Sequence, residues 1–143
     1  MPEPPPLLLD THVWIWLVEG VEHEMTPGAI QVLREASRDG RLLVSHISVW
    51  EVAMLVGKGR LQLRVDIDSW IERALAAPGV SAVELSPDIL IESARLPGEV
   101  HGDPADRIIM AAARRAGATV ATRDRAMAGY AAEGHLAVLD VAA

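Results

Sequence analysis

The sequence contains no cysteine. A chain without thiols forms no disulfide bond, has no thiolate nucleophile and cannot build a cysteine-ligated zinc site. Phenylalanine is also absent and tyrosine occurs once, so the buried core must consist of aliphatic side chains and some of the four tryptophans. The composition therefore excludes cysteine-dependent catalysis. It also favours a cytoplasmic protein, because disulfides are rare in that compartment.

Long apolar runs are missing as well, since none approaches the roughly 18 residues that a membrane-spanning helix requires. The opening segment, MPEPPPLLLD, lacks the basic region of a signal peptide. We therefore expect a protein without membrane association, with a short Pro-rich extended tail over residues 1–6. The remaining residues, 7–143, have the length and apolar content of a single domain.

Basic residues are few: 13 Lys and Arg stand against 20 Asp and Glu, which gives a formal net charge of −7. An overall field of this sign repels nucleic acid. Any chemistry on nucleic acid must then use local cations or a bound metal ion. The same acidic surface suits a basic protein partner.

Short β-type segments alternate with helical segments along the chain. The expected strands cover residues 7–10, 41–45, 80–85, 118–122 and 136–141. The expected helices cover 11–18, 26–40, 48–56, 66–77 and 103–116, with two more that begin at Ser86-Pro87 and at Asp124. This alternation predicts an α/β sandwich with a mainly parallel sheet. A functional site in such a fold lies beyond the carboxyl ends of the strands.

Four acids fall where an expected strand is followed by a helix. They are Asp10, Glu51, Asp106 and Asp124. A structural explanation exists for each of them. For example, Ser48 and Glu51 have the spacing of a capping box, and Asp106 is an acid in the first turn of a helix that Asp103 and Pro104 begin. Four separate caps and turn residues would account for these acids without any chemistry.

The apolar surroundings of two acids argue against caps alone. Glu51 shares a helix face with Met54, and Asp106 shares one with Ile109 and Met110. Burial of an ionised carboxylate is costly unless the charge is paired, and clustered carboxylates repel one another. A divalent cation relieves both effects. Oxygen ligands in a chain without cysteine suit Mg²⁺ or Mn²⁺.

Four segments occur in order along nearly the whole chain: LLLDTHVWIW, VSHISVWEVAMLVGKGRL, HGDPADRIIMAAA and ATVATRDRAM. Together they resemble the motifs of PIN-domain proteins, and the likeness is greatest to the VapC-type toxins of bacterial toxin–antitoxin pairs. The resemblance implies a three-layer sandwich whose sheet has the strand order 3-2-1-4-5 between helices. It also implies metal-dependent cleavage of RNA by an endoribonuclease.

The resemblance also assigns roles to residues. It implies that the catalytic acids, which hold Mg²⁺ or Mn²⁺, are Asp10, Glu51, Asp106 and Asp124. It makes Asp103 a helix cap and an accessory residue, and Thr122 a small hydroxyl residue that lines the site. Relatives often carry an aromatic residue between the two aspartates of the third motif, where this chain has Ala105. This difference leaves the local packing open.

The resemblance implies three partners: an RNA substrate, a small cognate antitoxin and a second copy of the chain in a homodimer. The net charge favours a basic antitoxin, which we expect to dock on the helices near Trp14, Trp16 and Trp50. The spacing of the tryptophans is typical of core or interface residues. Stacking on RNA bases is the weaker alternative for them.

Several other residues near the motifs have a weaker claim on function. His12, His46 and His101 are more typical of hydrogen-bonding residues than of ligands or bases. Five cations near the motifs could contact RNA phosphates, although most of them are better explained as solvated surface charges. These cations are Lys58, Arg60, Arg107, Arg123 and Arg125.

Two other classes of function stay open. A PIN-like interaction protein could carry the same acids with little or no catalysis. A phosphoryl-transfer protein also gathers acids at strand ends, but dehalogenase-type phosphatases need an aspartate where this chain has His12, and a receiver domain needs a lysine later than Lys58. Cleavage of RNA that depends on metal and on these acids would decide between the classes.

Overall fold

The computed structural model of the chain describes residues 3–100 and 102–142. The strands in this part of the chain are β1 (Leu7–Leu9), β2 (Leu42–Ser45), β3 (Val80–Val83), β4 (Thr119–Thr122) and β5 (Ala137–Asp140). The helices are α1 (Thr11–Glu19), α2 (Pro27–Arg38), α3 (His46–Gly57), α4 (Ile67–Leu75), α5 (Pro87–Ala94), α6 (Pro104–Ala116) and α7 (Arg125–Ala132). Strands and helices therefore alternate as the sequence predicts.

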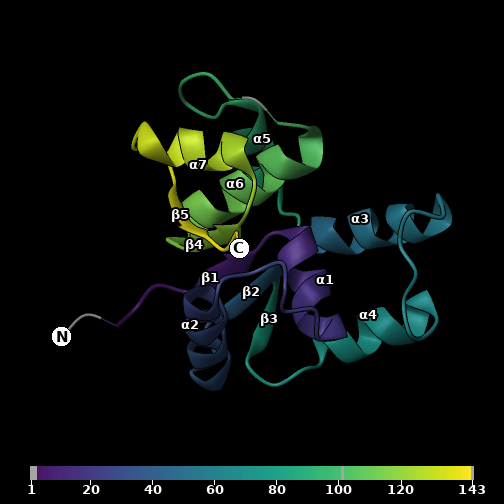
Figure 1. Cartoon of the computed structure of the whole chain (residues 1–143). Helices are drawn as coiled ribbons and strands as arrows, with labels where there is room; N and C mark the ends of the chain where they lie inside the picture. Colours follow the sequence, from purple (N-terminus) through teal and green to yellow (C-terminus); the bar gives the residue numbers. More distant parts are fainter. Residues whose placement is uncertain (1–2, 101, 143) are drawn as a thin grey trace.

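The strands form one sheet in the order β3-β2-β1-β4-β5, and each neighbouring pair is parallel (Figure 1). At least one helix lies between consecutive strands, which gives the crossover connection that parallel pairing requires. The predicted α/β class and the predicted strand order are confirmed. None of the helices in the described ranges has the length and apolar character needed to cross a membrane.

Two apolar cores flank the sheet and make the fold a three-layer sandwich. Side chains alternate along β1, so Leu7 and Leu9 belong to one core and Leu8 to the other. The first core includes α1, α2 and α4, and in it Trp14 packs edge-on against Trp70 with ring centroids 4.9 Å apart. The second core is covered by α5, α6 and α7, which lie together on one side of the sheet (Figure 1).

Helix α6 begins where its sequence predicts. Asp103 is the N-cap, and its Oδ1 accepts a hydrogen bond from the backbone N–H of Asp106 at 2.8 Å. Pro104 occupies the first turn, and Gly117 follows the last residue with a φ of 63°, a left-handed conformation that glycine adopts without steric cost. The cap fixes the start of the helix and, with it, the position of Asp106 in the first turn.

Helix α3 begins earlier than the sequence analysis predicts. Its N-cap is Ser45, whose hydroxyl accepts a hydrogen bond from the backbone N–H of Ile47 at 3.2 Å. Ser48 is buried in the first turn, where its hydroxyl contacts the hydroxyl of Thr11. The predicted capping box of Ser48 and Glu51 is therefore wrong, and Glu51 lies in the second turn of α3.

The two central strands, β1 and β4, end side by side. Leu9 pairs with Ala121, and the backbone N–H of Asp10 donates to the carbonyl oxygen of Ala121 at 3.0 Å. Helix α1 starts directly after Asp10, and α7 starts directly after Asp124. The carboxyl edge of the sheet therefore carries acids from both central strands next to the starts of two helices.

Candidate active site

A buried threonine joins two of the acids at the carboxyl edge. The hydroxyl of Thr122, the last residue of β4, donates to Oδ2 of Asp10 at 2.6 Å. The hydroxyl oxygen of Thr122 in turn accepts a hydrogen bond from the backbone N–H of Asp124 at 2.9 Å. Oδ1 of Asp10 accepts a hydrogen bond from the backbone N–H of Thr11 at 2.8 Å. Both oxygens of Asp10 are thus oriented by protein donors.

A second buried threonine fixes the acid that comes from α3. The hydroxyl of Thr11 donates to Oε1 of Glu51 at 2.5 Å and lies 2.8 Å from the hydroxyl of Ser48. Because Thr11 has a single hydroxyl proton, its bond to Glu51 leaves Ser48 as the donor of the second bond. Thr11 and Ser48 are both buried. Their hydrogen bonds therefore connect α1 to α3 and hold Glu51 on the side of Asp10.

Asp106 is the most strongly perturbed of these acids. Burial, and then the negative charges of four other carboxylates, raise the pKa of Asp106 to about 7. The four carboxylates are those of Asp103, Asp10, Asp124 and Glu51. Burial also raises the pKa of Asp10 and of Glu51, although hydrogen bonds from neighbouring residues oppose it. The structure therefore brings the four predicted ligands and Asp103 into electrostatic range of one another.

Cations do little to offset this negative charge in the part of the chain that the structure describes, where His12 lowers the pKa of Asp10 without forming an ion pair with it. Within residues 3–100 and 102–142, no lysine, arginine or histidine forms an ion pair with any of the five acids. The same ranges contain no three side chains already arranged as a set of metal ligands. Carboxylate oxygens are the ligands that Mg²⁺ and Mn²⁺ prefer, and a divalent ion would favour the ionised carboxylates against both burial and mutual repulsion. The donor set therefore fits such an ion once the side chains turn toward it.

Asp124 caps a helix and still has one oxygen available. Its Oδ1 accepts hydrogen bonds from the backbone N–H groups of Ala126 at 2.7 Å and Met127 at 3.2 Å, and so caps α7. Its Oδ2 accepts no hydrogen bond from the residues that the structure describes. The two interpretations of Asp124 are compatible because each uses a different oxygen. Asp103, by contrast, is exposed and caps α6.

Comparison with known proteins identifies the family of this fold and site. The PIN-domain profile matches residues 7–133. The chain belongs to the PIN-domain family. Ribonuclease VapC22 of Mycobacterium tuberculosis is 32% identical to it over 124 residues, which make up 87% of this chain and 91% of that protein. The predicted family resemblance is therefore confirmed.

Solved structures share this PIN fold at low sequence identity. VapBC2 from Rickettsia felis, bound to a DNA fragment from its promoter, aligns with a TM-score of 0.64 and 15% identity over 93% of this chain and 96% of that chain. FitAcB from Neisseria gonorrhoeae aligns with a TM-score of 0.61 and 22% identity, with the same two coverages of 93% and 96%. At these identities the likeness concerns the fold.

The cations near the motifs of this PIN domain have unequal roles. Arg107 is half-buried, and its Nε donates to the backbone carbonyl of Ser93 at 2.9 Å, which ties α6 to the end of α5. Arg125 pairs with an acid of β5. Lys58 and Arg60 are exposed after α3. Arg107 is therefore a structural residue rather than a solvated one.

The three histidines near the motifs also differ in their position relative to the acids. His12 is exposed in the first turn of α1, next to Asp10. His46 is the first residue of α3. The prediction for His101 lies outside the described residues. His12 is thus the histidine that the structure places beside the acids.

The sequence analysis missed the roles of Thr11 and Ser48. Each is a small hydroxyl residue close to a predicted acid, Thr11 directly after Asp10 and Ser48 three residues before Glu51. A buried hydroxyl is costly unless it has a hydrogen-bond partner, so such a residue predicts a specific polar neighbour. Here that neighbour is Glu51, reached through Thr11.

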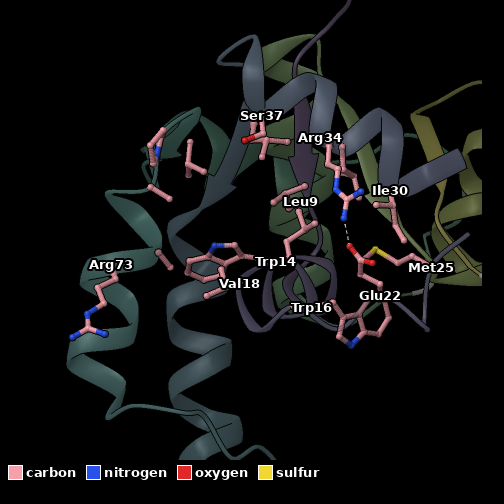
Figure 2. Close-up of a pocket in the computed structure, with 18 residues that line it drawn as sticks. Leu9, Trp14, Trp16, Val18, Glu22, Met25, Ile30, Arg34, Ser37 and Arg73 are labelled. Carbon is pink, nitrogen blue, oxygen red and sulfur yellow. Dashed lines mark hydrogen bonds and ion pairs between the residues drawn. The ribbon is translucent and has the colours of Figure 1, made fainter. Parts of the chain in front are cut away.

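An apolar groove of about 450 Å³ lies between α1, α2 and α4 (Figure 2). Trp14 and Val18 lie in its middle part, with Arg73 toward one end and the ion pair of Arg34 and Glu22 toward the other. Most of the remaining lining residues are aliphatic. The groove is therefore mostly apolar and contains none of the four predicted metal ligands, although residues of α1 border both the groove and the acids.

The raised pKa of Asp106 predicts how the stability of the metal-free protein changes with pH. The folded protein holds a proton on Asp106 up to about pH 7, whereas the unfolded chain releases it near the ordinary value of 3.8. Between these values the native state binds more protons, so stability falls as pH rises. Asp106→Asn removes this contribution, and the variant should gain more stability over the parent at about pH 8 than at about pH 5. Urea unfolding in EDTA measures the difference, and an equal effect at both pH values contradicts the assignment.

Proposed function

We propose that this PIN domain is a metal-dependent endoribonuclease and the toxin of a type II toxin–antitoxin pair. The proposal depends above all on the five acids at the carboxyl edge, whose mutual repulsion no ion pair of the described residues relieves. The 32% identical relative is named a ribonuclease, and the structural neighbours include VapBC complexes. A cytoplasmic location belongs to the same proposal, because the RNA substrate is found there.

In this proposal Asp10, Glu51, Asp106 and Asp124 hold one or two Mg²⁺ or Mn²⁺ ions. When bound, such an ion lowers the pKa of a water molecule and neutralises charge on the scissile phosphate. Thr122 keeps Asp10 oriented through its 2.6 Å hydrogen bond. Asp106 gives up the proton that it holds near neutral pH, and the N-terminus of α6 favours its ionised form. The chain's own residues would thus present oriented carboxylates to the metal ion, and the ion would face the phosphate.

Cleavage of RNA should depend on a divalent metal and on Asp106. Asp106→Asn should lower the metal-dependent rate by at least roughly 100-fold, because even the loss of groups that orient metal ligands costs about 10- to 100-fold. Thermal stabilisation by Mn²⁺ should disappear in the same variant. The measurement is cleavage of single-stranded RNA by the purified, partner-free protein with Mn²⁺ and with EDTA, beside thermal melts.

Asp103→Ala is the matched control within the same segment. Loss of the α6 cap should cost about 0.5–2 kcal/mol of stability and leave much of the metal-dependent cleavage in the folded protein. Undiminished cleavage in EDTA would contradict the metal mechanism. If Asp106→Asn cleaves RNA near the parent rate while Asp103→Ala is folded and inactive, the roles of the two aspartates are reversed.

We further infer that the groove between α1, α2 and α4 receives an apolar segment of the antitoxin. Its lining is mostly apolar and carries charged residues at its ends. Trp14 and Trp16 both line the groove, whereas Trp50 is 55% exposed on α3 and lies outside it. The net charge of −7 suits a basic partner. Of the three tryptophans expected at the docking site, Trp14 and Trp16 line the groove and Trp50 does not.

Two exposed valines with nearly equal exposure test this groove. Val18 lines the groove and is 39% exposed, whereas Val32, on α2, does not line it and is 38% exposed. Val18→Arg should prevent co-purification with the protein encoded by a small neighbouring reading frame, because a charge replaces an apolar contact. Val32→Arg should leave co-purification intact. Equal binding by the two variants would contradict the groove as the docking site.

We also infer a homodimer through the face of α5. Leu85, Leu90 and Ile91 are large apolar side chains that stay exposed on and just before this helix. Light scattering at micromolar concentration should give about twice the chain mass of 15.4 kDa, and Ile91→Arg should shift the protein toward the monomer. A species of 15.4 kDa alone in the parent protein would refute the dimer.

A further inference from the structure

A pocket of about 230 Å³ opens beside the acids. Its lining residues are Asp10, His12, Val13, Trp16, Arg123 and Asp124. Two of these are proposed metal ligands, and the others include an imidazole, an indole and a guanidinium group. A molecule in this pocket would therefore touch both the acids and a set of aromatic and cationic side chains.

Trp16 and Arg123 are held against one another in this pocket. Cζ of Arg123 lies 4.9 Å from the centroid of the Trp16 ring. The guanidinium group also forms an ion pair with Glu24, with 2.5 Å between Nη1 and Oε2. The ring of His12 lies 6.2 Å from the ring of Trp16. These contacts orient the indole and the guanidinium group before a ligand binds, which lowers the ordering cost of binding.

Trp16 differs from the tryptophans of the core. Trp14 and Trp70 are 1% and 2% exposed and pack against each other. Trp16 is half-buried and lines the pocket beside the acids. An accessible indole offers a stacking surface to any nucleobase, because every base has a π-face.

A second pocket, of about 410 Å³, adjoins the first, because His12 and Trp16 line both. It reaches Arg60 and Arg64, two exposed residues between α3 and α4. Glu19 and Glu24 line the second pocket too, and they pair with Arg64 and Arg123, respectively. Each of the two pockets that Trp16 lines therefore contains at least one arginine. An aromatic side chain next to cations is a feature of sites that bind single-stranded nucleic acid.

We propose that Trp16 and Arg123 form a subsite for one unpaired nucleotide of the RNA substrate, next to the scissile phosphate. The base stacks on the face of Trp16 that Arg123 does not cover, and the guanidinium group of Arg123 contacts the adjoining phosphate. Paired bases in a duplex are stacked on their neighbours, so this subsite selects single-stranded RNA. The inference rests on the proposed ribonuclease function and adds a substrate preference to it.

The test compares RNA with an abasic chain. Binding of a short fluorescent oligoribonucleotide, and of a ribose-phosphate chain of the same length without bases, is measured by anisotropy in the Asp106→Asn background, so that the RNA is not cut. The parent background should prefer the oligoribonucleotide by roughly 5- to 100-fold, the range that one stacked base provides. Trp16→Leu should abolish this preference, and Trp16→Phe should restore part of it.

Two further variants separate stacking from other effects. Trp50→Leu changes an exposed tryptophan outside both pockets and should keep the full preference. Arg123→Gln should weaken both ligands equally and reduce the salt dependence by about 0.7 of a logarithmic unit per decade, the value for one phosphate contact to a single strand.

Three outcomes overturn the subsite: no preference for bases in the parent background, an unchanged preference in Trp16→Leu, or an effect of Trp16→Leu on capture of the antitoxin alone. The last outcome would make Trp16 a protein-contact residue. Cleavage of RNA by the protein with an intact Asp106 is measured in parallel. An absence of cleavage contradicts the proposed function, whereas cleavage with an unchanged base preference in Trp16→Leu contradicts only the subsite.

Discussion

Repulsion among carboxylates at one edge of the sheet is the constraint on which the site depends. The parallel arrangement of β1 and β4 puts Asp10 and Asp124 at neighbouring strand ends, and α3 and α6 add Glu51 and Asp106 from two other directions. Burial and then the charges of the neighbouring carboxylates raise the pKa of Asp106 to about 7. A fold that tolerates this cost without a neutralising ion pair is suited to bind a cation, and the cation chemistry follows from the same feature.

Hydroxyl groups and helix starts make this arrangement tolerable. Thr122 binds Asp10 through its side chain, and Thr11 binds Glu51, so each of these acids has a neutral donor that lowers its pKa against the effect of burial. Asp106 lies in the first turn of α6, where backbone N–H groups favour negative charge. Neutral donors orient the carboxylates without cancelling their charge. Lysine or arginine in these positions would have neutralised the carboxylates and left less charge for a metal ion.

The sequence predicts the sheet and most helix starts. The spacing of apolar residues, the helix-capping residues and the turn residues are all local signals. Asp103 and Gly117, for example, mark both ends of α6. The start of α3 could not be predicted from local signals, because Ser45 and Ser48 are both good N-cap residues. Which serine caps the helix depends on the contact of Ser48 with Thr11, a residue 37 positions away in the sequence. The acids are likewise visible in the sequence, and the structure brings them into electrostatic range, while their role as ligands stays a prediction.

Tryptophan spacing shows a further limit of the sequence, because Trp14 and Trp16 are only two residues apart on α1 yet lie in different surroundings. Trp14 lies in the core and borders the apolar groove, whereas Trp16 borders the groove and both pockets beside the acids. If the antitoxin occupies the groove and an RNA base stacks on Trp16, the two ligands share one side chain. A partner could then weaken RNA binding through Trp16 without touching any carboxylate. Inhibition by the antitoxin would therefore have a component that an added metal ion does not reverse.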